Sequence, residues 1–238
     1  MIQKFKKLKI FNTLRVIYEG EDLDAIILQR SYSYVTVVSP RPLDLQTKGF
    51  ELNKKDVAVI DIREGLEKIM QNFKDTTRNE IRQTFKIDNL YFEILQSPSQ
   101  SDFEETYNLY SDFEKGQGRK PWKKEKFKEL GIVRAKLKNS LIAGVFFYDL
   151  KPTLLVAQIF STRILTDDKD VQRIISKSTR RLVYELCSYG VNNGYTKVNL
   201  SSVNFSTKQK ANVAQFKMFF NPKIETEYTY IRRPWFMV

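Results

Sequence analysis

A long helical pattern set between two short strand patterns restricts the fold more than any other feature of the sequence. Apolar residues recur at helical spacing from Val171 to Tyr189, which predicts a helix over residues 170–193. β-prone runs at 153–161 and 197–201 flank this helix directly. A crossover helix brings the chain back to the end of the sheet where the preceding strand began. The two runs are therefore expected to be parallel neighbours.

Turn signals separate the other patterns of this region. Asn139-Ser140 and Lys151-Pro152 divide three successive β-prone runs, which are expected to form an antiparallel meander. The predicted fold class is α/β (α+β), a mixed, mostly antiparallel sheet flanked by helices. The expected order from residue 63 is two helices over 63–86, strand 91–95, helix 102–115, a short basic helix over 121–130, strands 133–137, 141–148 and 153–161, helix 170–193, strand 197–201, helix 206–219 and strand 225–231.

The first 62 residues differ from the rest of the chain. Short β-prone runs alternate there with turn signals, over 14–18, 24–28, 32–38 and 57–62. The basic and apolar opening, from Lys4 to Ile10, is interpreted as a first strand with a solvated face, with membrane contact as the alternative. Two domains are expected: an N-terminal β-rich subdomain over 1–62 and a main domain over 63–238.

Missing and rare residue types exclude several kinds of chemistry. The sequence has no histidine and one cysteine, Cys187. A Ser-His-Asp or Cys-His triad and an internal disulfide framework therefore cannot exist, and no metal site is expected. Cys187 follows Val183 by one turn of the predicted long helix, where burial is expected rather than nucleophilic reactivity. Chemistry would rely on carboxylates, Tyr, Lys, Ser or backbone groups.

The charge balance favours an anionic partner. Lys and Arg number 40 against 28 Asp and Glu, a formal net charge of +12. Such a field attracts phosphate-bearing molecules, nucleic acid or an anionic membrane face, although it also simply maintains solubility. The longest apolar stretch, Leu141 to Tyr148, is far shorter than the roughly 20 residues of a spanning helix. A cytoplasmic location is expected, with peripheral contact at the inner membrane surface as a further hypothesis. No pattern sets the oligomeric state.

Three segments suggest a family. Residues 77–86, TRNEIRQTFK, resemble a basic "TRN-x-IR-x-x-x-K" helix; Tyr110 to Lys115-Gly116 resembles a helix-to-loop segment. Lys210, then Phe216-Lys217-x-Phe219-Phe220 and Tyr228-Thr229-Tyr230, resemble an "FK-x-x-FG" ending before a last strand. With the element order over about 63–231, these segments resemble the GNAT acyltransferase fold, in the branch related to the FemABX peptidyltransferases. FemABX proteins usually have two such domains, whereas this chain has room for one.

The resemblance implies an acyl donor that is a co-substrate, with no tightly bound cofactor. CoA-dependent GNAT enzymes bind pyrophosphate in a glycine-rich turn at the start of the long helix. This sequence has no glycine between Gly144 and Gly190, and Asp167, Asp168 and Asp170 crowd that helix start, where they suit a cap but repel pyrophosphate. The FemABX branch also lacks the cradle and uses aminoacyl-tRNA, so aminoacyl-tRNA is the first expectation; acyl carrier protein or unconventionally bound acyl-CoA are the alternatives.

In the resembled fold, two parallel strands part near their carboxyl ends, and exposed backbone groups hold the donor. The donor-binding residues implied here are Ile159, Phe160, Ser161, Arg163, Arg173 and Asn204. Catalytic candidates are Tyr148, Ser202 and Tyr228, although aromatic residues in strands usually pack and Ser or Asn after a strand usually forms a turn. No general base is assigned.

Basic side chains provide the substrate-binding candidates. Arg78, Arg82 and Lys86 are spaced i, i+4 and i+8, which predicts one cationic stripe on a helix. Residues 115–128 carry seven Lys or Arg around Trp122 and Phe127, a composition that suits phosphate with a stacked ring and equally suits a solvated loop. Lys217 is the preferred single phosphate ligand. The full predicted substrate set is Arg78, Arg82, Lys86, Lys115, Trp122, Lys210 and Lys217.

Together these features predict an N-acyltransferase or aminoacyltransferase that acts on an amino group of an anionic acceptor, a nucleotide- or lipid-linked sugar or peptide of the cell envelope. Expected partners are this anionic substrate and tRNA or an acyl carrier protein. Two other classes stay open: an RNA-binding or single-strand-binding module that uses residues 115–128, and a catalytically inactive GNAT-like scaffold.

Overall fold

The computed structural model of the chain describes residues 2–7, 11–17 and 32–233. These residues form two compact units. One contains residues 58–201 and 212–223, and the other contains the described residues up to Val57 together with 202–211 and 224–233. The N-terminal run is thus joined in its unit by a segment from near the end of the chain.

The smaller unit is built on a sheet in the order β1-β2-β3-β10-β4. β1 pairs with β2 and β3 with β10 in antiparallel fashion, whereas β2 and β3 are parallel. Its core includes Leu14, Val35, Phe50 and Tyr230, and the Tyr230 hydroxyl accepts a hydrogen bond from the Leu43 amide at 2.6 Å. The strands are Ile2–Lys7 (β1), Phe11–Ile17 (β2), Tyr34–Ser39 (β3), Glu51–Asp61 (β4) and Lys223–Arg232 (β10), with a short 3-10 turn, η1, at Gln46–Lys48.

Most of the strands expected before residue 63 are present. β2, β3 and β4 overlap the predicted runs, and β1 is the predicted first strand. The run expected over 24–28 lies outside the described residues. β10, expected to complete the main domain, pairs with β3.

The larger unit contains the predicted meander and crossover. Its strands follow the order β9-β8-β7-β6-β5, with the end of β4 beside β9. The successive pairs from β5 to β8 are antiparallel, and β8 is parallel to β9, as predicted. The strands are Leu90–Leu95 (β5), Gly131–Leu137 (β6), Ser140–Leu150 (β7), Thr153–Ser161 (β8) and Lys197–Ser202 (β9).

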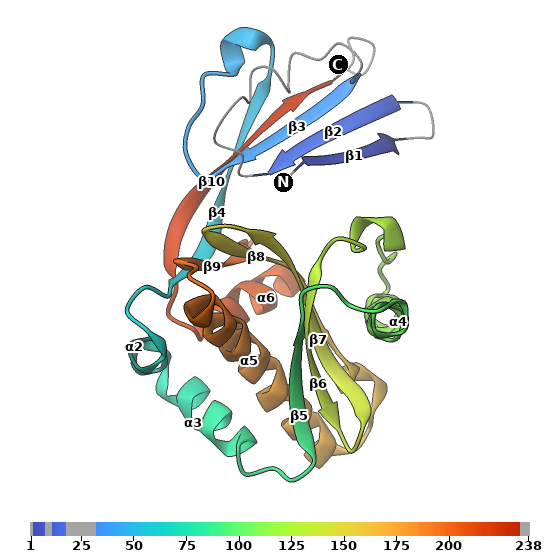
Figure 1. The fold of residues 1–238 in the computed structure, drawn as a ribbon, viewed down its shortest axis with the longest axis vertical. Helices are drawn as coiled ribbons and strands as arrows, with labels where there is room; N and C mark the ends of the chain where they lie inside the picture. Colours follow the sequence, from blue (N-terminus) through green and yellow to red (C-terminus); the bar gives the residue numbers. More distant parts are fainter. Residues whose placement is uncertain (1, 8–10, 18–31, 234–238) are drawn as a thin grey trace. The chain divides into compact units, whose positions relative to one another are not determined.

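Helices cover both faces of this meander (Figure 1). α5 lies on one face with α2 and α3 against it, and α4 lies on the other face. α5 buries Ile175, Leu182 and Leu186, the apolar series from which the crossover was predicted. The helices are Leu66–Asn72 (α2), Asp75–Thr84 (α3), Gln100–Gly116 (α4), Lys169–Asn192 (α5) and Lys208–Met218 (α6), with short 3-10 turns at Lys124–Lys126 (η2) and Thr162–Leu165 (η3).

The short basic helix predicted over 121–130 is wrong, because only η2 forms there. Two tyrosines of α4 hold the segment in an extended path. The Tyr110 hydroxyl accepts a hydrogen bond from the Trp122 amide at 3.0 Å, and the Tyr107 hydroxyl donates to the Trp122 carbonyl at 2.6 Å. Phe127 is fully buried against Tyr110 and Phe146, so side-chain packing overrides the local helical pattern.

Within the described residues, no helix has both the length and the apolar character needed to cross a membrane.

Candidate functional site

The two parallel strands part after three residue pairs. β8 and β9 are in register from Thr153↔Lys197 to Leu155↔Asn199, whereas β8 continues to Ser161. A β-bulge falls just beyond the last pair: Phe147 opposes Val156 and Phe146 opposes Gln158, so Ala157 has no opposite residue on β7. Because a bulge bends its strand, β8 turns away from β9 there. The strand parting expected from the resemblance is therefore present.

The β9 side of the parting is held by a local backbone device. Ser201 has a left-handed backbone conformation with φ of 69°. The Asn199 side-chain oxygen accepts the Ser201 amide at 2.7 Å, and Asn199 is itself buried. Non-glycine residues adopt this conformation at a cost, so the surrounding hydrogen bonds must maintain it. The turn at Ser201 and the bulge at Ala157 together end the ladder between the strands.

An open pocket of about 780 Å³ begins at the end of β8; we call it the α5 pocket. Ser161 and η3 form one side, the first three turns of α5 another, and α3 and α6 the rest. All its lining residues belong to the larger unit. Five cations line it: Arg163, Lys169, Arg173, Lys177 and Arg180.

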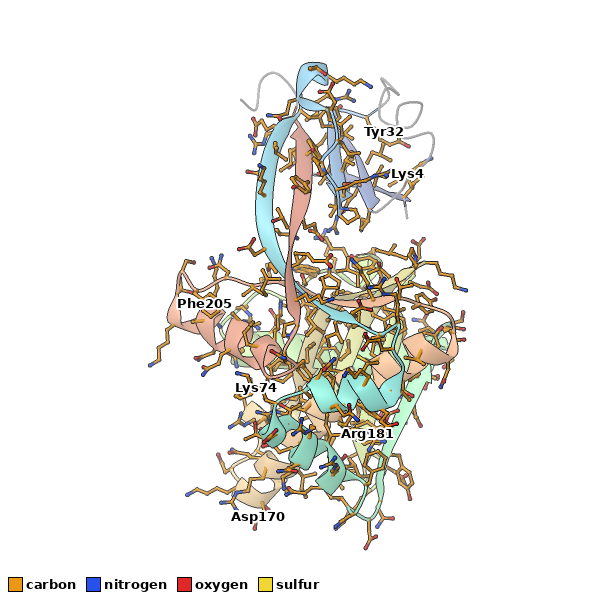
Figure 2. All side chains as sticks on the ribbon, turned by 90° about the vertical axis from the view of Figure 1, so that its left-hand side faces the viewer. Lys4, Tyr32, Lys74, Asp170, Arg181 and Phe205 are labelled. Carbon is orange, nitrogen blue, oxygen red and sulfur yellow. The ribbon has the colours of Figure 1, made fainter. Side chains whose placement is uncertain are left out.

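These cations make the α5 pocket suitable for an anion. Glu80 is the one carboxylate among its lining residues. Arg173 is paired with Asp170 of the first turn, whose position Figure 2 shows, at 2.9 Å, and Arg180 is paired with Glu80. Arg163, Lys169 and Lys177 have no ion pair among the described residues. Several partly free cations around one concave surface favour a phosphate-bearing ligand.

The start of α5 is capped by the protein itself. Asp168 Oδ1 accepts the amides of Asp170 at 2.8 Å and Val171 at 3.1 Å, and Gln172 donates to the Thr166 carbonyl at 2.6 Å. The predicted capping role of the aspartates is confirmed for Asp168. Because its carboxylate occupies two first-turn amides, an anion in the pocket would contact side chains rather than the helix end.

Of the predicted donor set, three residues come together at the α5 pocket. These are Ser161, Arg163 and Arg173. Phe160 is 1% exposed and packs on Tyr110 and Phe146, so it supports the pocket from within the core.

The other two donor residues do not line the pocket. Ile159 lies on β8 opposite Val145. Asn204 belongs to the smaller unit, where its side-chain oxygen accepts a hydrogen bond from the Ser206 amide at 2.8 Å. This contact is the turn-forming role that was the alternative to donor binding.

The predicted cationic stripe on α3 is shorter than expected. α3 ends at Thr84, so Lys86 lies beyond the helix and does not continue the row. Arg78 donates to the carbonyls of Gln71 at 2.6 Å and Phe73 at 3.0 Å, which caps the end of α2. Arg78 and exposed Arg82 line a second pocket of about 540 Å³, beside Tyr184 and away from the α5 pocket. Burial raises the Tyr184 pKa.

Lys217, the preferred phosphate ligand, lies outside the α5 pocket. It is 7% exposed and does not line the α5 pocket, whereas its neighbours Phe216 and Phe219 do. Lys210 is exposed, in the part of α6 that belongs to the smaller unit, with its ammonium 3.5 Å from the Ser206 hydroxyl.

The basic segment 115–128 is more neutralised than its composition suggests. Arg119 pairs with Glu114 at 2.6 Å, Lys124 pairs with Glu104, and Lys115 lies 3.7 Å from Asp112. The Trp122 ring stacks on Phe127 with centroids 5.9 Å apart, and the Lys126 ammonium lies 4.8 Å from its centroid. A nucleic-acid base would compete with these contacts for the ring, so the structure does not strengthen the RNA-binding alternative.

None of the three catalytic candidates lies at the α5 pocket. Tyr148 is 4% exposed on β7, opposite Leu155. Ser202 and Tyr228 belong to the smaller unit, where Tyr228 is near Lys54, whose ammonium is 5.8 Å from the ring centroid. Cys187 is buried, as predicted, and burial raises its thiol pKa far above the ordinary value.

Sequence reasoning selected Arg163, Lys169 and Arg173 as side chains that could hold a phosphate, but it missed Lys177 and Arg180, which extend the helical row along one wall of the pocket. Lys169, Arg173 and Lys177 are spaced i, i+4 and i+8 on α5, and Arg180 follows. This is the spacing from which the α3 stripe was predicted, so the signal was present in the sequence. Glu80 had no comparable signal.

Comparisons with known proteins address the fold. No family model matches the sequence, and no curated protein matches it. FemX matches with a TM-score of 0.69 at 9% identity, over 96% of this chain and 83% of FemX. The C-terminal domain (DUF2156) of a protein assigned as a lysylphosphatidylglycerol synthetase from Agrobacterium fabrum matches with a TM-score of 0.65 at 16% identity, over 98% and 80%.

L-PGS from Bacillus licheniformis is a third match, with a TM-score of 0.59 at 17% identity, over 98% of this chain and 80% of that one. The chain therefore has the fold of FemX and of these lysylphosphatidylglycerol synthetase structures, which confirms the expected mixed α/β fold class.

Proposed function

We propose that this chain is an acyl- or aminoacyltransferase that moves an acyl group from an activated, phosphate-bearing donor to an amino group of an anionic cell-envelope acceptor. The observation that carries the proposal is the shared position of Ser161, where the parting of β8 and β9 meets the cationic α5 pocket. The fold shared with FemX and with the lysylphosphatidylglycerol synthetase domain supports a transferase in general.

The chemistry requires little from side chains. Beyond Leu155, β8 has no ladder with β9, so backbone N–H groups along 156–161 that face the parting are available to polarise a donor carbonyl. The acceptor amine attacks the carbonyl carbon, the new C–N bond forms, and the bond to the donor oxygen or sulfur breaks. The proton lost by the amine passes to the leaving group, directly or through water. A chain without histidine can support this sequence of steps.

The donor would bind with its phosphate against Arg163, Lys169 and Lys177. Because Asp168 occupies the helix start, this arrangement favours a donor recognised by side chains over one that needs an open helix end. Aminoacyl-tRNA is the first donor to test, followed by acyl carrier protein and acyl-CoA. The net charge of +12 suits an acceptor at an anionic membrane face.

The test is transfer measured by mass spectrometry, with each donor class offered to amine-bearing phospholipids and nucleotide-linked precursors. Lys177→Glu should lower turnover roughly tenfold or more, because it reverses a charge in the pocket. Lys68→Glu makes the same charge change on the exposed surface of α2, outside both pockets, and should leave turnover nearly unchanged. No mass increase with any donor, from protein shown to be folded, would refute the proposal.

A further inference from the structure

β5 is an open edge strand of the larger unit. It is the last strand in the sheet order, and among the described residues it pairs with β6 alone. The pairing is one-to-one from Leu90↔Leu137 to Leu95↔Ile132, without a bulge. In Figure 1 no helix or strand of the larger unit is drawn over β5. One side of β5 is therefore free along its length.

This free side carries backbone groups without partners. In an antiparallel strand with one neighbour, every second residue directs its N–H and C=O away from that neighbour. Within the described part of the chain, no hydrogen bond from a loop, a helix or a side chain reaches the backbone of residues 90–95. Such a row of groups is a template for one more strand.

The composition of β5 does not protect this edge. β5 has the sequence LYFEIL, with no proline or lysine, and its one charged residue, Glu93, is paired with Arg134 and lies 3.7 Å from Lys136. Soluble proteins usually protect an edge strand with lysine, proline or a bulge. The edge strand of the smaller unit, β1, has the lysine-rich sequence IQKFKK. The apolar edge of β5 thus points to a strand partner.

The apolar side chains of this edge are also incompletely buried. None of the six residues of β5 is buried, whereas residues 131–135 of β6 all are. Tyr91 is 53% exposed, and Phe85, just before the strand, is 61% exposed. The Arg181 guanidinium carbon lies 3.3 Å from the Phe85 ring centroid and 5.1 Å from that of Phe92. Three aromatic rings therefore form a partly exposed surface along the edge.

β5 is complementary to a second copy of itself. In an antiparallel pair, outward-directed groups meet only outward-directed groups, so a twofold axis must pass through a residue rather than between two. An axis at Phe92 places Leu90 opposite Ile94 of the second copy and Tyr91 opposite Glu93. An axis at Glu93 would place two carboxylates directly opposite each other, which is unfavourable. The axis at Phe92 is therefore the preferred register.

We infer that the β5 edge is the interface between two copies of this chain, with the two β5 strands antiparallel across a twofold axis at Phe92. Because Arg181 contacts both rings, Phe85 lies near Phe92, so the exposed Phe85 rings of the two copies would also meet near the axis. The inference is independent of the proposed function, since no residue of β5 lines either pocket.

Sedimentation velocity at pH 7 tests the interface. A six-residue strand pair with a few aromatic rings is a small interface, so the wild type should change from monomer to dimer between about 1 and 200 µM. Tyr91→Glu places a second carboxylate opposite Glu93 at both ends of the pair and should weaken dimerisation roughly tenfold or more. The Tyr91 side chain is already more than half exposed, so the variant should fold, which its thermal transition checks.

Two further variants are matched to Tyr91→Glu. Tyr91→Lys removes the same ring but places an ammonium opposite Glu93 of the second copy, so it should weaken the dimer less than Tyr91→Glu does. Phe205→Glu changes another exposed aromatic residue, in the smaller unit, and should leave dimerisation unchanged.

Disulfide formation tests the register. Across an axis at Phe92, the two Phe92 Cα atoms would lie about 4.5–5.5 Å apart, within the range that a disulfide spans. Oxidised Phe92→Cys should therefore form a covalent dimer, whereas Phe205→Cys at the same concentration should not. The native Cys187 is buried and should not compete.

A wild type that stays monomeric up to about 200 µM, or a dimer that Tyr91→Glu does not weaken, would overturn the inference. Equal disruption by Tyr91→Glu and Tyr91→Lys, with no covalent dimer from Phe92→Cys, would overturn the pairing of β5 with itself at Phe92. Each of these results would leave the proposed function as it stands.

Discussion

Replacing Arg134 by methionine should destabilise the larger unit through one buried charge cluster. Arg134 lies on β6 and is 4% exposed. Its guanidinium donates to Glu93, the residue opposite it on β5, to Asp102 Oδ1 at 2.6 Å and to Glu105 Oε2 at 3.1 Å. The cluster therefore joins α4 to the sheet face that it covers.

The magnitude follows from the burial of the four partners. Removing one partner of a fully buried ion pair costs about 3–5 kcal/mol, because a charge is left without compensation. Here the three carboxylates are 39%, 30% and 44% exposed, so water can replace part of what they lose. Methionine also keeps much of the apolar volume. We expect a loss of about 2 kcal/mol, or roughly 4–8 °C in Tm for a chain of this size.

The assay is urea denaturation at pH 7, with Lys136→Met as the matched control. Lys136 also removes one positive charge from the cluster, but its ammonium lies 3.7 Å from both Glu93 and Glu105. Its loss should cost less than about 0.5–1 kcal/mol. Equal losses in the two variants would refute the reasoning, because they would show that total charge matters and the buried guanidinium geometry does not.

The same comparison should depend on pH. A hydrogen bond from the Ser99 hydroxyl, and then the Arg134 guanidinium, lower the pKa of Asp102. A carboxyl whose pKa is lower in the folded state contributes stability above its unfolded value of about 3.9, and this contribution is lost as the pH falls through the folded value. The difference between wild type and Arg134→Met should therefore shrink below about pH 4. A difference that is the same at pH 7 and pH 3 would contradict this attribution.

Two further changes test local structure by chemical denaturation. Asp168→Ala should lower the free energy of unfolding by about 1 kcal/mol, because it removes the acceptor for two amides of α5. The control Asp167→Ala removes a neighbouring charge but no cap bond, so it should cost less than about 0.5 kcal/mol. Similar losses in the two variants would refute the capping role of Asp168. Gly144→Ala should lower the free energy of unfolding by about 1–3 kcal/mol, because its new Cβ would lie 2.6 Å from the Phe160 ring, which is packed in the core. An unchanged stability would contradict this and would mean that the ring can move.

Periodicity was sufficient to predict the arrangement that places the site. The α5 series and its flanking strands predicted parallel β8 and β9, and the turn signals predicted the meander. These signals are reliable because burial acts on every third or fourth residue of a helix and every second residue of a half-buried strand. The helix prediction around Trp122 failed because the path of this segment is set by its hydrogen bonds with Tyr107 and Tyr110, which lie on α4.

The burial of Lys217 could not be predicted, for a different physical reason. α6 buries Ala214 and Lys217 while leaving Val213 48% exposed. Charged and apolar residues are therefore not separated onto an exposed and a buried face of this helix, as they are on α5. A charged residue on such a helix cannot be placed on the solvent side from its sequence. Its neighbours Phe216 and Phe219 line the α5 pocket, whereas Lys217 does not.

The aspartates before α5 show how a correct local prediction can hide a site. Counted by charge alone, Asp167, Asp168 and Asp170 should repel a phosphate from this end of the helix. The structure commits Asp168 to two backbone amides and Asp170 to Arg173, so much of their charge is already compensated within the first turn. Beyond that turn, Lys177 projects a cation without a compensating carboxylate among the described residues. A phosphate bound there would lie along the side of α5, and its affinity should depend on lysine and arginine charges and fall steeply with salt.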